Sequence, residues 1–193
     1  MLRRLYDWTI ARAAGPRAPF VLAAVSFAES SFFPIPPDVL LVPMVLAARE
    51  RAWWFATVCT IASVAGGVLG YTIGHALYDS LGQWLIGLYG LQSRADEFRA
   101  WYAEKGAWVI LIKGMTPIPY KVVTITSGLA GYDLVAFVLL SAVTRAARFF
   151  LVAGLCWRFG TPIRDFVERR LTLVTTLFAV GLVGGFVVLR YAF

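Results

Sequence analysis

Histidine, cysteine and acidic residues are scarce in this 193-residue chain, and each scarcity excludes a class of site. His75 is the only histidine, so one chain cannot build a metal centre from several imidazoles. The sequence also contains no Cys-x-x-Cys pair, no Walker phosphate-binding loop and no Ser/His/Asp set for nucleophilic catalysis. We therefore expect no metal, no cofactor and no enzymatic activity.

The two cysteines and the charge balance exclude two further classes. Cys59 and Cys156 both fall in apolar segments, and we predict that they are small buried side chains rather than a disulfide. Lysine and arginine number 18 against 11 acidic residues, which gives a formal net charge of +7. A basic balance can indicate nucleic-acid binding, but here the basic residues stand at the ends of apolar segments, as membrane topology requires. No nucleic-acid partner is expected.

Apolar residues are what the chain has in abundance. Hydrophobic residues make up 60% of the sequence, and the mean hydropathy of +0.73 is far above that of a water-soluble domain. The length allows only a few membrane crossings. The composition therefore predicts one polytopic membrane domain over residues 1–193.

Two Pro-Ile-Pro sequences interrupt these apolar segments. Closely spaced prolines remove backbone donors and force extended geometry on the residues before them. In hydrocarbon, such a broken backbone survives only where protein or a water-filled cavity covers it. Two breaks at corresponding places in two halves are typical of a transporter site near the bilayer midplane. The prolines concerned are Pro34, Pro36 and Pro37 in the first break and Pro117 and Pro119 in the second.

The apolar pieces beside both breaks are too short to cross a bilayer comfortably. Residues 17–33 would form a helix about 25 Å long, whereas a spanning helix needs ~20 apolar residues. We therefore predict re-entrant hairpins at about 17–48 and 107–131. The expected fold is all-α, with each hairpin followed by a transmembrane helix, the two units related as an inverted repeat, and a further transmembrane helix at the C-terminal end. The three spans are expected at 53–77, 134–157 and 171–191.

Three local patterns complete this layout. Gly66, Gly70 and Gly74 recur every fourth residue in the first span and predict close helix packing. Ser93 can cap an amphipathic interfacial helix before the second hairpin. Ten arginines fall in the stretches 1–17, 49–51 and 158–170, which this layout puts on one side of the membrane. The positive-inside rule then places the N-terminus in the cytoplasm.

Six ionisable residues interrupt the apolar segments, where a charge is costly and must pair, meet water or carry function. Two acids face four bases, so a counter-anion such as a phosphate group would balance the surplus. We interpret the bases, with Thr124, as candidate substrate-binding residues and the acids as candidate proton carriers. The alternative is a set of buried ion pairs that hold the hairpins to the second span. The six residues are Glu29, Asp38, Lys113, Lys121, Arg145 and Arg148.

Several of these motifs together resemble the DedA family of membrane proteins with a VTT (SNARE-associated) domain, and in particular its short YqaA-type members. The resemblance covers residues 17–157 and rests on Glu29-Ser-Ser-Phe-Phe-Pro-Ile-Pro-Pro-Asp38, Gly66-Gly-Val-Leu-Gly-Tyr-x-x-Gly74, Lys113-Gly-Met-Thr-Pro-Ile-Pro-Tyr-Lys121 and Ser127-Gly-Leu-Ala-Gly131.

The resemblance implies re-entrant hairpins, a membrane-embedded acidic pair and basic pair, and lipid translocation that often depends on the proton motive force. The acidic pair corresponds to Glu29 and Asp38. The family's two arginines around the second break correspond approximately to Lys113 and Lys121, where lysine binds phosphate as a point charge rather than a fork.

The sequence thus predicts a lipid translocase of the bacterial inner membrane that carries an anionic phosphate headgroup, such as undecaprenyl phosphate or a phospholipid, with protons as the coupled partner. Two other classes stay open: a proton-coupled transporter of a small soluble solute, and a non-transporting membrane-organising protein. Self-association into a homo-oligomer is also left open.

Overall fold

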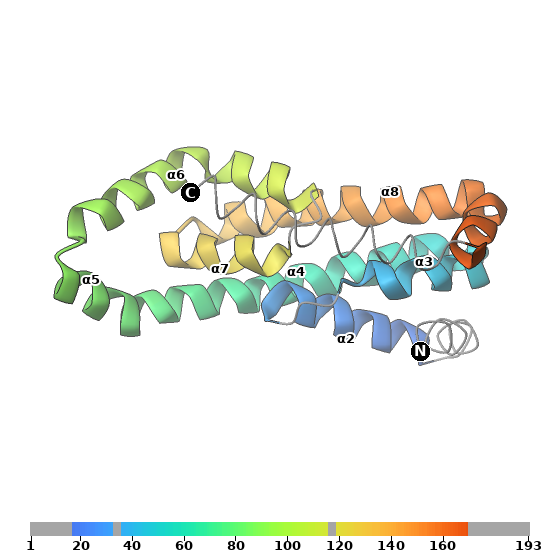
Figure 1. Cartoon of the computed structure of the whole chain (residues 1–193), viewed down its shortest axis with the longest axis horizontal. Coiled ribbons are helices and arrows are strands. Elements are labelled where there is room, and N and C mark those ends of the chain that lie inside the picture. Colours follow the sequence, from blue (N-terminus) through green and yellow to red (C-terminus); the bar gives the residue numbers. More distant parts are fainter. Residues whose placement is uncertain (1–16, 33–35, 116–118, 170–193) are drawn as a thin grey trace.

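The computed structural model describes residues 17–32, 36–115 and 119–169, and every regular element in these ranges is a helix (Figure 1). The predicted all-α class is therefore confirmed for this part of the chain. The helices are α2 (Ala18–Ser31), α3 (Asp38–Ala47), α4 (Ala52–Leu77), α5 (Gln83–Tyr89), α6 (Gln92–Met115), α7 (Tyr120–Ala130) and α8 (Leu134–Arg169), with a 3-10 turn at Arg49–Arg51 and a π-helical turn at Tyr78–Gly82.

Both predicted breaks separate two helices. Pro37 is the residue before α3, and Pro119 is the residue before α7, which are positions where proline's fixed φ favours a helix start. Pro36 lies outside the helices. Pro34 and Pro117 lie outside the described residues, as does the predicted final span at 171–191.

Two helical segments are long and apolar enough to cross a membrane among the described residues. One runs continuously from Arg49 to Tyr89, 41 residues through α4, the π turn and α5, and the other is Leu134–Gly160 in α8. At 1.5 Å per residue the first is about 60 Å long, twice the ~30 Å of a hydrocarbon core. This segment is long enough to cross and continue beyond the membrane.

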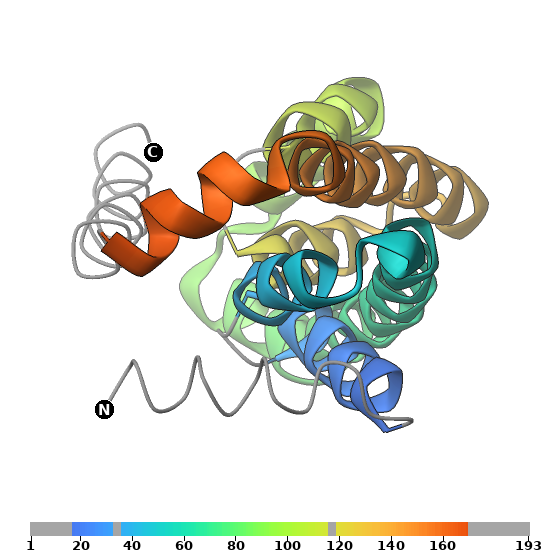
Figure 2. The same ribbon diagram turned by 90° about the vertical axis from the view of Figure 1, so that its right-hand side faces the viewer.

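The short helices lie beside the two long ones in opposite halves of the molecule. Figure 1 shows α2 and α3 along one half of the long axis and α6 and α7 along the other. α2 and α7 both pack against α4, while α3 and α6 both pack against α8. Figure 2, which looks along the long axis, shows the end of α8 turning away from the bundle after its kink at Phe159.

The predicted glycine ridge allows α4 to approach both α2 and α7, which confirms close packing. A Cβ at Gly66 would lie 2.1 Å from the carbonyl oxygen of Phe27 in α2. At Gly74 it would lie 2.1 Å from the carbonyl oxygen of Ile125 in α7. Gly70 lies between them, against the Thr124 side chain. α2 and α7 therefore follow one another along a single face of α4.

The helix before the second break, α6, differs from the expectation. Residues near Ser93 were expected to form a separate interfacial helix, with the hairpin beginning at about 107, but α6 is one helix from Gln92 to Met115. A single glycine costs a helix only about 1 kcal/mol relative to alanine. Gly106, which lies against the rings of Tyr102 and Tyr132, therefore does not end the helix.

Candidate functional site

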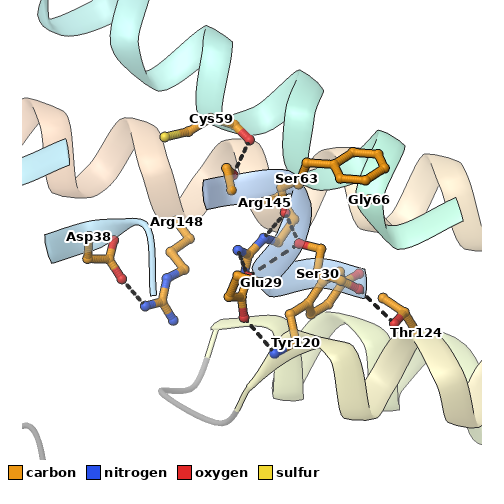
Figure 3. Close-up of polar contacts among 12 residues, drawn as sticks. Glu29, Ser30, Asp38, Cys59, Ser63, Gly66, Tyr120, Thr124, Arg145 and Arg148 are labelled. Atoms are coloured by element: carbon orange, nitrogen blue, oxygen red, sulfur yellow. Dashed lines mark hydrogen bonds and ion pairs between the residues drawn. The ribbon is translucent and has the colours of Figure 1, made fainter. Parts of the chain in front are cut away.

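A buried ion pair joins α2 to α8 (Figure 3). Glu29, in the last turn of α2, is 6% exposed, and Arg145 of α8 is 2% exposed. Nη2 of Arg145 donates to Oε2 of Glu29 at 2.9 Å, and its Nε donates to the Ser63 hydroxyl of α4 at 2.6 Å. The guanidinium carbon also lies 4.7 Å from the ring centroid of Tyr120 and 4.6 Å from that of Phe149. The charge is thus enclosed by polar and aromatic partners.

The Glu29 carboxylate joins the two helix breaks. Its Oε1 accepts a hydrogen bond from the backbone N–H of Tyr120, the first residue of α7, at 2.9 Å. Its Oε2 also accepts from the Ser30 hydroxyl at 3.3 Å, and that hydroxyl lies 2.7 Å from the Ser63 hydroxyl. An anion at a helix N-terminus is stabilised by the helix dipole. Glu29 therefore holds α7 as well as α8.

A second ion pair links α3 to α8. Nη2 of Arg148 donates to Oδ2 of Asp38, and both side chains are 18% exposed. Asp38 is the first residue of α3, where the helix dipole again favours a negative charge. Its other carboxylate oxygen, Oδ1, is buried and has no hydrogen-bond partner among the described residues. This pair is more accessible than the pair of Glu29 and Arg145.

Two further contacts hold the end of α2 to the start of α7. The Thr124 hydroxyl donates to the backbone carbonyl of Ser30 at 3.0 Å, and Nζ of Lys121 donates to the carbonyl of Phe32 at 3.3 Å. Carbonyl groups at a helix end have no partner within the helix. Thr124 is fully buried and Lys121 partly exposed. In this structure Thr124 therefore supports the broken backbone, whereas the sequence suggested it as a substrate contact.

The structure brings most of the predicted site residues together, and it pairs each acid with one arginine. Glu29 pairs with Arg145, and Asp38 pairs with Arg148. Lys113 at the end of α6 and Lys121 at the start of α7 flank the second break, and both are partly exposed. The ion pairs considered as a structural alternative are present. Among the described residues, no three His, Cys, Asp or Glu side chains gather as a metal site.

Sequence reasoning missed three members of the site: Ser30, Ser63 and Tyr120. Signals for two of them were available. Ser30 follows a membrane-depth carboxylate, and Ser63 precedes Gly66 by three residues, which places it on the packed face of α4. No signal pointed to Tyr120, because its backbone N–H, rather than its side chain, contacts Glu29.

Exposed apolar side chains lie on α8, the helix that carries both arginines. On α8 they recur every fourth residue, and Val135, Leu139 and Val143 are each more than 60% exposed. Such a row of exposed apolar side chains is unfavourable in water, whereas lipid tails match it. The fold and site together define a helical membrane protein with paired charges between two broken helices.

Comparison with known proteins gives the family. The VTT-domain family model matches residues 35–158. An uncharacterized protein of Haemophilus influenzae is 38% identical over 168 residues, which cover 85% of this chain and 87% of that protein. An uncharacterized protein of Histophilus somni is 39% identical over 168 residues, with the same coverage. No solved structure gives a significant match. The chain belongs to the VTT-domain family, the DedA family of membrane proteins.

Proposed function

We propose that this protein moves an anionic, phosphate-bearing lipid, such as undecaprenyl phosphate or a phospholipid, across the bacterial inner membrane. The observation that carries the proposal is the accessible charge beside the first break. Asp38, the first residue of α3, and Arg148 each keep 18% of their side-chain surface exposed.

Apolar side chains at the helix ends surround this charged region. A lipid has both parts that such a surface would contact, because its headgroup needs charged partners while its tails stay in hydrocarbon. A small soluble solute offers nothing for the exposed apolar groups to bind. The apolar residues beside the two breaks, with their exposed fractions, are Phe32 (61%), Val39 (48%), Met115 (47%) and Val122 (43%).

Positive charge beside the second break favours a phosphate headgroup. Lys113 and Lys121 flank that break, both are partly exposed, and Lys121 donates to a carbonyl of the first break. Lysine binds phosphate as a point charge with three rotatable donors. Such binding suits a headgroup that must be released again.

Protons are the proposed coupled partner, through Glu29 or Asp38. A carboxylate that gains a proton loses the charge that binds its arginine, so protonation would loosen the contact between a hairpin and α8. The proposed orientation has the N-terminus in the cytoplasm and the two hairpins re-entrant from opposite sides. It is supported by the basic residues at one end of the bundle, which include Arg49, Arg51 and Arg158.

A second candidate, a non-transporting membrane-organising protein, is favoured by the ion pairs themselves. Removing one partner of a buried pair is strongly destabilising, so two pairs could serve only to fix the hairpins on α8. Transport measurements separate the two candidates.

The test is lipid movement in proteoliposomes, with and without a pH gradient. Fluorescent phosphatidic acid and phosphatidylcholine would be placed in both leaflets, and an impermeant quencher would report what reaches the outer one. We expect phosphatidic acid to move faster and to respond to the gradient. Arg148→Gln should remove the preference, whereas Arg158→Gln, at an exposed position, should not. Equal rates for both lipids, matching protein-free vesicles, would contradict the proposal. Uptake of a soluble phosphate compound without lipid movement would favour a solute transporter.

A further inference from the structure

The Glu29 carboxylate occupies a position with the features of a phosphate site. Its two oxygens accept from a guanidinium, a hydroxyl and a backbone N–H at the first turn of a helix. These three kinds of donor also bind phosphate oxygens. We propose that the donors form an anion site for a phosphate group, and that Glu29 is a built-in competitor that closes it.

The donors keep their positions through contacts that do not involve Glu29. Nε of Arg145 is held by the Ser63 hydroxyl at 2.6 Å, and the same hydroxyl lies 2.7 Å from that of Ser30. The start of α7 is fixed by the phenol of Tyr120, which donates to the Ser141 hydroxyl at 2.7 Å. Withdrawal of the carboxylate would therefore leave a formed site rather than a collapsed one.

The buried charge supplies the driving force for exchange. Arg145 is 2% exposed, so without Glu29 its guanidinium would be a buried cation without its counter-charge. Leaving a buried charge uncompensated is strongly unfavourable. The site would then take up a small anion that reaches it. If the proposed function holds, the phosphate belongs to a lipid headgroup, which would enter as Glu29 leaves. Only this identity of the molecule that carries the phosphate rests on the proposed function.

The first experiment is chemical rescue of the Glu29→Ala variant of the full-length protein, solubilised in a non-ionic detergent. Cys59 and Cys156 are buried, so a thiol-reactive dye reports unfolding. Inorganic phosphate or acetate would replace chloride at constant ionic strength. We expect the variant to melt below wild type and phosphate to raise its melting temperature by roughly 5–10 °C at 100 times its Kd. Wild type should not respond.

Two matched variants show whether the rescue occurs at this site. Glu29→Ala combined with Arg145→Leu removes the guanidinium, so phosphate should no longer stabilise the protein. Glu104→Ala breaks an exposed ion pair with Lys105 outside the site and should show little phosphate response. Equal responses in all three variants would mean non-specific stabilisation and would overturn the proposal. Rescue by acetate but not by phosphate would overturn the phosphate assignment.

A second variant decides the matter if Glu29→Ala does not fold, and it identifies the carrier of the phosphate. Glu29→Gln keeps the shape of the side chain and removes its charge. In nanodiscs of phosphatidylcholine with added phosphatidic acid, it should retain phosphatidic acid at least 10-fold more tightly than wild type. Stabilisation by inorganic phosphate without this lipid preference supports a site for free phosphate. If neither effect is seen in either variant, the proposal is overturned. Because these measurements need no transport, a failure of the proposed function would be seen separately.

Discussion

Substitution of one glycine on α4 tests how the site depends on helix packing. Gly66→Ala would put a Cβ 2.1 Å from the backbone carbonyl oxygen of Phe27, where ordinary contacts begin near 3.4 Å. α2 and α4 would have to separate by about 1.3 Å, the difference between these two distances. Ser31 also donates from its hydroxyl to the Gly66 carbonyl at 3.0 Å, so the shift would strain this bond. Glu29 lies two residues after Phe27 and would move with α2.

The magnitude follows from two opposing terms. Alanine favours a helix over glycine by about 1 kcal/mol, whereas overpacking a well-packed contact costs about 1–3 kcal/mol and occasionally more. At Gly66 the obstacle is backbone rather than a flexible side chain, so we expect a net loss of about 2 kcal/mol in the free energy of unfolding. For a chain of this size that is a decrease of about 4–8 °C in melting temperature.

The adjacent glycine is the matched control. A Cβ at Gly67 would meet nothing closer than the Thr124 methyl group at 3.5 Å, so Gly67→Ala gains helix propensity without a clash. Thermal unfolding with a thiol-reactive dye, which detects the buried Cys59 and Cys156 as they become accessible, compares both variants with wild type. We expect Gly67→Ala to melt at or above the wild-type temperature. Equal melting temperatures for the two variants would refute the predicted packing of α2 on α4.

Three further predictions concern the charges and the breaks. Arg145→Gln leaves Glu29 buried without its counter-charge and should lower stability by about 3–5 kcal/mol, whereas Arg148→Gln, in the more exposed pair, should lower it less; equal losses in unfolding measurements would contradict this ranking. Glu29→Gln should remove the dependence of lipid transport on a pH gradient, and an unchanged dependence would exclude this carboxylate as a coupling group. In a cysteine-free background, single cysteines at Pro36 and Pro119 should resist impermeant thiol reagents or react only through a cavity; fast labelling from the side opposite the expected entrance would contradict re-entrant hairpins.

The local parts of this fold were predictable because they depend on neighbouring residues. Pro37 and Asp38 carry the signals of a helix start, and α3 begins there. Gly66, Gly70 and Gly74 recur every fourth residue, and this local pattern predicts close helix packing. By contrast, the expectation of a separate interfacial helix after Ser93 was wrong, because residues 92–107 contain no proline and only one glycine, which does not stop a helix.

The pairing within the site was not predictable, because it depends on distant segments. Glu29 and the backbone N–H of Tyr120 are 91 residues apart in sequence. The sequence showed two acids and four bases at membrane depth, but it could not say which acid meets which base. It also could not show that Ser63 lies against Arg145, since that contact depends on how α4 crosses α8.

The contacts that join the two breaks differ in what can replace them. Broken backbone in hydrocarbon needs partners for its polar groups, and here α2 and α7 supply them to each other. The hydrogen bond from Thr124 to the Ser30 carbonyl is neutral and fully buried, so an anion would gain less there than from the charged donors. The contacts of Glu29 and Lys121 carry charge, and a phosphate group can take the same donors from each. We therefore expect headgroup binding to break the charged contacts first. The Thr124 hydrogen bond would remain, and α2 and α7 would move relative to one another about it.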